Sequence, residues 1–176
     1  KGSVSSQFLT ALLMAAPIYV QRTGTDLLIE VDGELISRPY VQITLNMMAA
    51  FGVQVTHDNW QRFTVPADAR YVSPGNINVE GDASSASYFM ALGALGGGPV
   101  RIDGAGSESI QGDIAFADVV EAMGATVKRE ATAITVSGPG VANGGRLKAF
   151  DLDFNHIPDA AMTAAAMAMF ADGPCL

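Results

Sequence analysis

The sequence contains few of the residues that would indicate disulfides, a membrane span or a nucleic-acid surface. Its 176 residues include one cysteine, Cys175, so no internal disulfide can form, which favours a reducing compartment such as the cytoplasm. No uninterrupted apolar run approaches the ~20 residues of a membrane-spanning helix. Only 10 Lys and Arg oppose 18 Asp and Glu, and this excess of acid excludes a broad nucleic-acid interface.

Signals for bound metals and nucleotides are also missing. No Cys and His residues occur at the spacings typical of a metal site, and the two histidines, His57 and His156, stand apart. The stretch "GAGSES" from residue 104 is followed by no lysine, unlike a phosphate-binding P-loop. A small anionic ligand remains compatible with the acidic chain, because backbone N–H groups at a helix start can hold a phosphate.

What the chain does contain is apolar sequence, 49% of its residues, in a length that allows one or two domains with a core. It opens on Lys1 rather than methionine and stops at "FADGPCL", where a further element should begin. We therefore expect a piece of a longer protein.

The first half predicts helices and strands in alternation. The helices cover residues 4–16, ending at Pro17, and 38–51; the strands cover residues 26–31, 53–56 and 61–65. Ser37 is placed to cap the second helix, and Gly52 ends it. Residues 66–75 have no periodicity, which indicates a linker.

The same order then returns. We expect strands over residues 76–81, 99–103, 125–130 and 132–138 and helices over residues 83–95 and 112–123, and a third round with a strand over 147–154 and a helix over 159–170. "KGSVSSQFLTALLMAAP" at the start resembles "VEGDASSASYFMALGALGGGP" from residue 79, which aligns Ser5 and Ser6 with Ser84 and Ser85. The chain therefore predicts an α/β fold of repeated β-α-β-α-β-β units, which normally stack on one another.

The Ser-Ser pair at the first helix start allows two interpretations. Ser5 and Ser6 can cap the helix, the commoner use of serine there. Together with Gln7 they can instead add donors to the unpaired N–H groups and form a phosphate site. The residues alone leave both open.

Five blocks, "GSVSSQFLTALLM", "ELISRPYVQITLNMM", "SPGNINVEGDASSASYF", "QGDIAFADVVEAMGA" and "NHIPDAAMT", together resemble the 5-enolpyruvylshikimate-3-phosphate synthase family, in its bacterial form, over essentially the whole chain. The resemblance implies the two-domain, inverse α/β barrel-like fold of enolpyruvyl transferases, incomplete here at both ends. Residues 1–79 would be the last part of one domain, and residues 80–176 the first part of the other.

The resemblance also implies a reaction and its residues. The family transfers the enolpyruvyl group of phosphoenolpyruvate to the 5-hydroxyl of shikimate 3-phosphate, with no cofactor or metal. Ser5, Ser6 and Ser37 would contact the shikimate phosphate, Gln7 both substrates, and Tyr40 the shikimate ring. Asp159 would bind the ring hydroxyls and act as the base. Helix capping is the structural alternative for Ser37 and Asp159, and an amphipathic contact is the alternative for Tyr40.

Asp82 is expected to have a structural role at the crossover between domains, with Ser84 and Ser85 as helix caps rather than ligands. The family's other phosphoenolpyruvate contacts lie outside this chain, so we expect no turnover by the chain alone. The alternatives are the sister transferase acting on UDP-N-acetylglucosamine, and a non-catalytic repeat module. The parent enzyme is expected to be a monomer, whereas the isolated chain, with incomplete stacks, is expected to self-associate.

Overall fold

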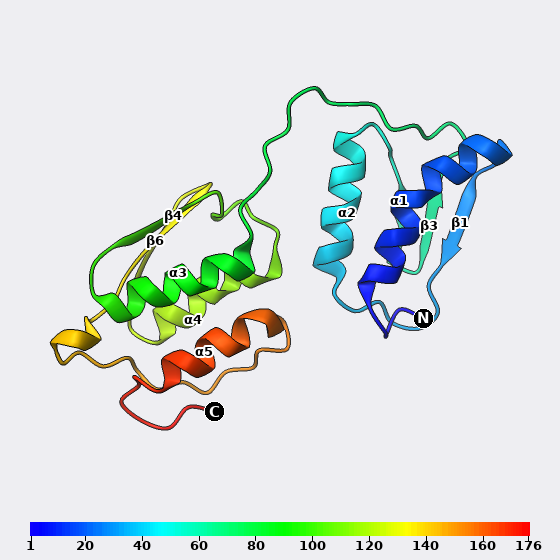
Figure 1. Cartoon of the computed structure of the whole chain (residues 1–176). Coiled ribbons are helices and arrows are strands. Elements are labelled where there is room, and N and C mark those ends of the chain that lie inside the picture. The colour runs from blue at the N-terminus through cyan, green and yellow to red at the C-terminus, as the bar shows by residue number, and fades with distance from the viewer. The chain divides into compact units, whose positions relative to one another are not determined.

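The structure is a computed structural model that describes residues 1–176, and the chain divides into two compact units, Lys1–Asn78 and Val79–Leu176. Each unit contains one three-stranded antiparallel sheet and helices packed on it (Figure 1). The mixture of helices and sheets confirms the predicted α/β class. No helix combines the length and the apolar character required to cross a bilayer.

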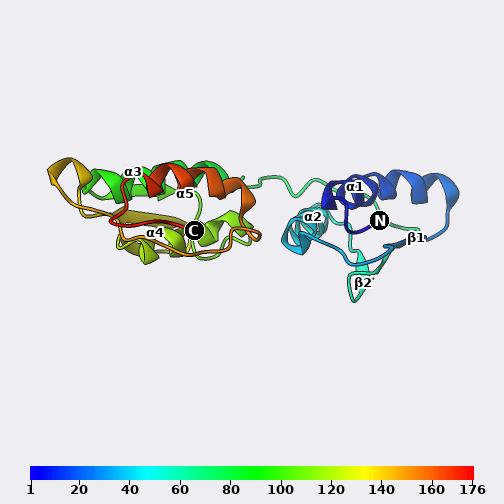
Figure 2. The same cartoon turned by 90° about the horizontal axis from the view of Figure 1, so that it is seen from below.

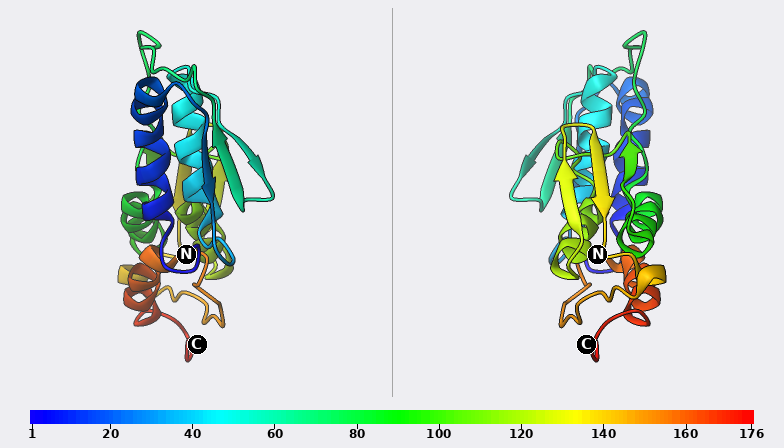
Figure 3. Two further views of the ribbon diagram at one scale, coloured as in Figure 1. Left: turned by 90° about the vertical axis from the view of Figure 1, so that its right-hand side faces the viewer. Right: turned by 90° about the vertical axis from the view of Figure 1, so that its left-hand side faces the viewer.

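The first unit follows the order α-β-α-β-β. Its elements are α1 (Ser6–Thr23), β1 (Leu27–Glu30), α2 (Arg38–Ala50), β2 (Thr56–Asp58) and β3 (Arg62–Val65), with the strands in the order β1-β3-β2. In Figure 3 the two helices lie on one face of the sheet, and in Figure 2 β2 lies on the side of this unit away from α1. Leu13, Val41 and Phe63 are fully buried between these layers.

Helix α1 does not end at Pro17, as the sequence pattern predicted, but continues to Thr23. Pro17 lacks the N–H that would bond to the preceding turn, which normally disfavours a helix interior. The apolar face nevertheless extends past it, since Ala16 and Val20 are as buried as Leu13. Burial of this face holds the helix together until Gly24 ends it at φ 68°.

Strand β2 begins later than the predicted strand over residues 53–56, and it includes His57. Its ring packs on Trp60, with the ring centroids 4.4 Å apart. The turn that follows holds Asn59 and Trp60 at positive φ, which is how the chain reverses so tightly between β2 and β3.

The second unit repeats the order and adds a further helix. Its elements are α3 (Ala83–Gly96), β4 (Val100–Asp103), η1 (Gly112–Ala115), α4 (Phe116–Ala122), β5 (Thr126–Arg129), β6 (Ala133–Ser137), η2 (Val141–Asn143), η3 (Pro158–Ala160) and α5 (Ala161–Ala168). The strands lie in the order β4-β6-β5. The predicted helix over 112–123 is thus a 3₁₀ turn, η1, that leads into a shorter α-helix, α4.

Two predicted strands are absent. Residues 76–81 form none, because a strand needs a neighbouring edge for its N–H and C=O groups, and here only the Gly81 N–H donates, to Gly104 O. Residues 147–154 pair instead with the end of the chain at separate points, including Leu147 N to Phe170 O (3.1 Å) and Leu176 N to Phe150 O (2.9 Å). The predicted leading strand of the repeat is therefore missing from the second and third rounds.

Helices α2 and α4 end with the same pattern of backbone hydrogen bonds. Gly52 donates to Ala49 O, and Gly124 donates to Glu121 O, both at 2.9 Å. Both glycines have positive φ, which ends each helix, as the sequence predicted for Gly52. The repeat is therefore real at this place in the fold.

The starts of α1 and α3 are aligned differently from the sequence prediction. The buried positions of the two helices match in this order: Ser6, Leu9, Leu13, Ala16 and Pro17 in α1, and Ala83, Ala86, Met90, Gly93 and Ala94 in α3. Ser5 therefore corresponds to Asp82, and not to Ser84. The alignment of the two Ser-Ser pairs was wrong because the N-cap of α3, Asp82, follows Gly81 directly, whereas the N-cap of α1, Ser5, comes two residues later relative to Gly2.

Both units expose large apolar side chains on the outer face of their first helix. They include Phe8, Leu12, Ile18 and Tyr19 on α1, and Tyr88, Phe89 and Leu92 on α3. A helix that is apolar all round normally packs on further protein. Self-association of the isolated chain stays a prediction.

Candidate functional site

The start of α1 offers N–H groups with little to satisfy them inside the chain. Ser5 is the N-cap residue, and its Oγ accepts a 3.2 Å hydrogen bond from Gln7 N. No acidic side chain lies in the first turn. Ser6 is buried, whereas Gln7 is exposed. Of the two interpretations of the pair, capping is thus seen for Ser5, and the helix dipole still faces solvent without an internal anion.

Gly2 joins this helix start to the loop before α2. Its N–H donates to Asp32 O (2.9 Å), and its carbonyl accepts from Ile36 N (3.2 Å). A Cβ on Gly2 would lie 2.6 Å from Val31 Cγ1 and 2.7 Å from Glu34 O, so only glycine allows this approach. The segment that leads to Ser37 is thereby held beside the segment that leads to Ser5.

Ser37 precedes α2 in a left-handed conformation, with φ 55° and ψ 42°. Its side chain makes no capping hydrogen bond, so the predicted cap is wrong. A capping residue normally has an extended backbone, which places its side-chain oxygen near the N–H groups of the first helical turn. The left-handed backbone of Ser37 does not place its hydroxyl there. Such a conformation in a residue other than glycine costs on the order of 1 kcal/mol and is concentrated at functional sites.

Tyr40 lies in the first turn of α2 and is half exposed. Its carbonyl accepts a hydrogen bond from Thr44 Oγ1 (3.1 Å), and Thr44 Oγ1 lies 2.9 Å from Thr10 Oγ1 of α1. This polar contact joins the N-terminal halves of the two helices, which run side by side in the same direction (Figure 1). Both N-termini therefore open at one end of the first unit.

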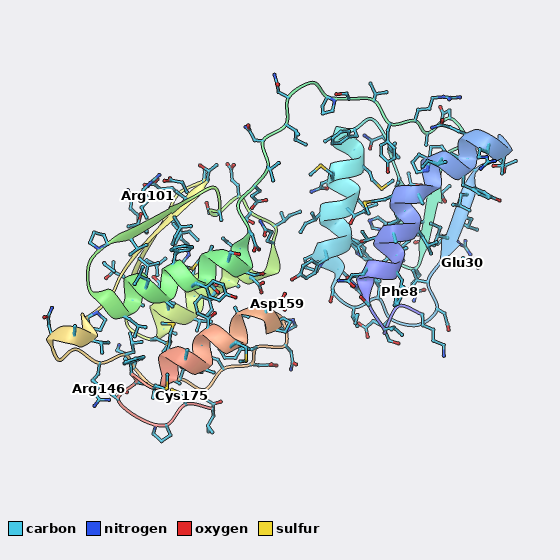
Figure 4. All side chains as sticks on the ribbon, viewed as in Figure 1. Phe8, Glu30, Arg101, Arg146, Asp159 and Cys175 are labelled. Carbon is cyan, nitrogen blue, oxygen red and sulfur yellow. The ribbon has the colours of Figure 1, made fainter.

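Five of the six predicted site residues come together at that end: Ser5, Ser6, Gln7, Ser37 and Tyr40. Asp159 belongs to the second unit, where it is exposed in the turn η3 that precedes α5 (Figure 4). The expected carboxylate at a helix start is therefore found, although the first turn is 3₁₀ rather than α.

The start of α1 also borders a shallow pocket of about 80 Å³ that the sequence analysis did not anticipate. Lys1, Ser5 and Glu30 line it, and its other walls are mostly apolar and include Phe8 (Figure 4). Of the predicted site residues, only Ser5 lines this pocket. Because the pocket is lined by one ammonium group and one carboxylate, it has no excess of positive charge.

A second and more voluminous pocket, of about 430 Å³, lies by the turn between β2 and β3. Its charged lining is Glu30, Asp32, Asp58 and Arg62, so it is predominantly acidic and repels a phosphate. None of the predicted site residues lines it. No group of three or more His, Cys, Asp or Glu side chains is arranged to hold a metal ion.

The start of α3, unlike the start of α1, is capped by an acidic side chain. The Asp82 carboxylate accepts from Ser84 N (3.1 Å) and Ser85 N (3.2 Å), and also from the Ser85 hydroxyl. The Ser85 hydroxyl bond, and then the two backbone N–H groups, hold the pKa of Asp82 below its ordinary value. Asp82 is thus the cap, as its structural role suggested, whereas Ser84 and Ser85 are its donors and not caps themselves.

Comparison with solved structures defines the class of protein to which this architecture belongs. The chain superposes on the enolpyruvyl transferase NikO from Streptomyces tendae with a TM-score of 0.67, over 94% of this chain and 37% of that one. The two sequences are 18% identical, so the likeness concerns the fold. The chain therefore has part of the enolpyruvyl transferase fold.

Sequence comparison is more specific. The EPSP synthase (3-phosphoshikimate 1-carboxyvinyltransferase) family profile matches residues 1–176, and this chain belongs to that family. The 3-phosphoshikimate 1-carboxyvinyltransferase of Bordetella avium is 65% identical over 175 residues, which cover 99% of this chain and 40% of that protein. The protein of the same name from Cellvibrio japonicus is 61% identical over 174 residues, covering 99% of this chain and 39% of that protein. The chain thus spans about two fifths of the length of these relatives.

Proposed function

We propose that this chain is part of an enzyme that transfers the enolpyruvyl group of phosphoenolpyruvate to the 5-hydroxyl of shikimate 3-phosphate and releases phosphate. In that enzyme Lys1–Asn78 is the last part of one domain, and Val79–Leu176 is the first part of the other. The names of the relatives give the reaction. The observation in the chain itself that supports it is the start of α1, which bears hydroxyl and amide donors and no acid.

A phosphate at this end would meet donors from two helices. Ser5 and Ser6 supply hydroxyl and backbone N–H groups. Ser37 supplies a hydroxyl that makes no capping hydrogen bond to α2. Charge-assisted hydrogen bonds of this kind are about twice as strong as neutral ones. The helix dipole of α1 adds a favourable field for the phosphate dianion.

The other side chains then have distinct tasks. Gln7, exposed one residue further along α1, can reach past the phosphate to both substrates. Tyr40 offers its ring as a face for the shikimate ring. Asp159 binds ring hydroxyls and takes the proton of the 5-hydroxyl as it attacks. Because the remaining phosphoenolpyruvate contacts are expected outside this chain, the chain alone should bind the first substrate without turnover.

A calorimetric titration of the chain with shikimate 3-phosphate, beside plain shikimate, tests the phosphate site. We expect binding that requires the phosphate and that weakens about tenfold in Ser37→Ala, for the loss of one charge-assisted hydrogen bond. Ser73→Ala is the matched control, because Ser73 is exposed in the coil after β3, near the end of the first unit and outside the starts of α1 and α2. Equal binding of the two compounds would contradict the proposal, and preferential binding of UDP-N-acetylglucosamine would point to the sister transferase. Binding of no ligand would favour the non-catalytic module.

Turnover requires the rest of the protein. A chimera in which this chain replaces the matching 175 residues of the Bordetella avium relative supplies it. We expect phosphate release that depends on both substrates and that falls by about 10³-fold or more in Asp159→Ala, since removal of a positioned base typically costs 10²–10⁴. An inactive, folded chimera would count against the proposed reaction.

A further inference from the structure

Asp113 is a buried acid with no part in the proposed reaction. It is 1% exposed in the turn η1. One carboxylate oxygen, Oδ2, accepts a short hydrogen bond from the Ser84 hydroxyl of α3. The other oxygen, Oδ1, is buried and has no hydrogen-bond partner. A carboxylate satisfied on one side only is an unfavourable core residue, so its presence calls for a reason.

The fold itself does not require an acid there. Gly52 and Gly124 end α2 and α4 in the same way, and the buried positions before them correspond. They match in this order: Val41, Thr44, Leu45 and Met48 in α2, and Asp113, Phe116, Ala117 and Val120 in η1 and α4. Asp113 therefore occupies the place of Val41, which is fully buried in the core of the first unit. A valine packs well at this place, which argues that the carboxylate serves a purpose other than packing.

Asp113 is one end of a polar chain through the second unit. The Ser84 hydroxyl donates to Asp113, and the Ser84 carbonyl accepts from the Ser87 hydroxyl (2.7 Å). Ser87 Oγ in turn lies 3.0 Å from Thr163 Oγ1 of α5, and both residues are buried. The chain of contacts ties η1 and α5 to one face of α3.

These are the elements on either side of Asp159. The turn η3, which contains Asp159, leads directly into α5 and packs against η1. A Cβ on Gly112, the neighbour of Asp113, would lie 3.3 Å from His156 O, so η1 and the segment before η3 touch through backbone. Figure 4 shows Asp159 beside the start of α5.

We propose that Asp113 is a positioning residue for Asp159: anchored on Ser84, its carboxylate fixes η1, and η1 fixes the turn that presents Asp159. The kinetic consequence of this assignment rests on the proposed function, whereas its structural consequence does not. A misplacement of about 1 Å in a reacting group can cost on the order of 100-fold in rate. A stabilising hydrogen bond at this place therefore matters more to the rate than to the fold.

The internal repeat supplies the test variant, Asp113→Val, which copies Val41. We expect it to fold with an unchanged or higher melting temperature, since it removes a half-satisfied carboxylate from the core. In the Bordetella avium chimera we expect kcat to fall by about 100-fold while KM for shikimate 3-phosphate changes much less. Asp113→Asn keeps an acceptor for Ser84 and should recover most of the lost kcat. Asp118→Val, an exposed acid on α4, is the control and should leave kcat unchanged.

Hydrogen exchange on the chain itself separates this inference from the proposed function. In Asp113→Val we expect faster exchange of the backbone amides of residues 156, 157, 159 and 160, with the sheet β4-β6-β5 unchanged. A uniform increase over the whole unit, or no change at residues 156–160, would overturn the positioning role. If the local change occurs while the unmutated chimera is inactive, the positioning role stands and the proposed reaction fails. An unchanged kcat in an active Asp113→Val chimera would overturn the link to Asp159.

Discussion

The starts of α1 and α3 occupy equivalent places in two copies of one structural repeat, yet they treat charge in opposite ways. At α1 the cap is Ser5, and the first turn holds no acid. At α3 the corresponding residue is Asp82, whose carboxylate accepts the N–H groups of Ser84 and Ser85. A second carboxylate, Asp113, bonds to the Ser84 side chain from the interior.

The difference shows how one repeat can serve two purposes. A helix N-terminus has a partial positive charge that is stabilised by an anion. In the second unit the chain supplies that anion itself, so the site is satisfied and contributes to stability. In the first unit no acid lies in the first turn, and under the proposed function the ligand supplies the anion. Similar sequence at the two starts therefore does not indicate similar electrostatics.

The largest effect is expected from making α1 like α3. Ser5→Asp places a carboxylate where Asp82 stands in the second unit, and its charge would exclude a phosphate from the helix start. We expect the affinity for shikimate 3-phosphate to fall by at least about 100-fold, or roughly 2.7 kcal/mol, measured by calorimetry. Ser73→Asp adds the same charge at an exposed position in the coil after β3 and should have little effect. Retained affinity in Ser5→Asp would show that the phosphate binds elsewhere.

The second prediction concerns how closely each helix approaches its sheet. Gly93 of α3 corresponds to Ala16 of α1, and a Cβ on Gly93 would lie 2.5 Å from Val136 O. Gly93→Ala should therefore lower the free energy of unfolding of the second unit by about 2 kcal/mol. Gly96→Ala, at a position with nothing within 4 Å of the added Cβ, is the matched control.

The single tryptophan separates the two units in this measurement. Trp60 lies in the first unit, so its fluorescence follows that unit alone, whereas circular dichroism follows both. Gly93→Ala should shift the dichroism transition and leave the fluorescence transition in place. A shift in both would mean that the units unfold together.

The smallest effect is expected from removing the carboxylate cap. Asp82→Ala leaves the N–H groups of Ser84 and Ser85 without an acceptor and should cost the second unit about 1 kcal/mol at neutral pH. Ser5→Ala, which removes one long hydrogen bond, should cost the first unit about half of that.

The cost of Asp82→Ala should depend on pH. Because folding lowers the pKa of Asp82 below its ordinary value of 3.8, the ionised form is the stabilising one. The advantage of the unmutated chain should be constant well above that value and disappear as the pH falls through the folded pKa. Unfolding by urea at a series of pH values measures it, and an advantage that persists at the lowest pH would mean that the carboxylate is not the source.

Local pattern predicted most of the helices and the paired strands because each is determined by residues close in sequence. The periodic apolar positions of α2 and α3, and the glycines Gly52 and Gly124 that end α2 and α4, are of this kind. The same holds for the family, which five blocks of sequence indicated and the family profile confirmed. The site residues that the resemblance implied stay predictions, and the structure adds that five of them share one end of the first unit.

Three of the errors involve partners that are distant in sequence. Pro17 stays inside α1 because the face around it is buried by the sheet. Residues 76–81 form no strand because no strand edge lies beside them, although their composition favours one. Ser37 adopts a left-handed conformation in a loop held by Gly2, which no local pattern indicates.

The sequence by itself therefore determined the class of fold, the repeat and the family, because these depend on periodic burial and on short blocks of residues. Only the tertiary structure decided which residues of the two repeats correspond, that Asp82 and not a serine caps α3, and that Asp113 replaces a core valine. The physical reason is that capping and burial depend on where a backbone turn places each group. A difference of two residues in the length of the segment before the helix places the Asp82 carboxylate where Ser5 places its hydroxyl, although the two Ser-Ser segments look alike in sequence.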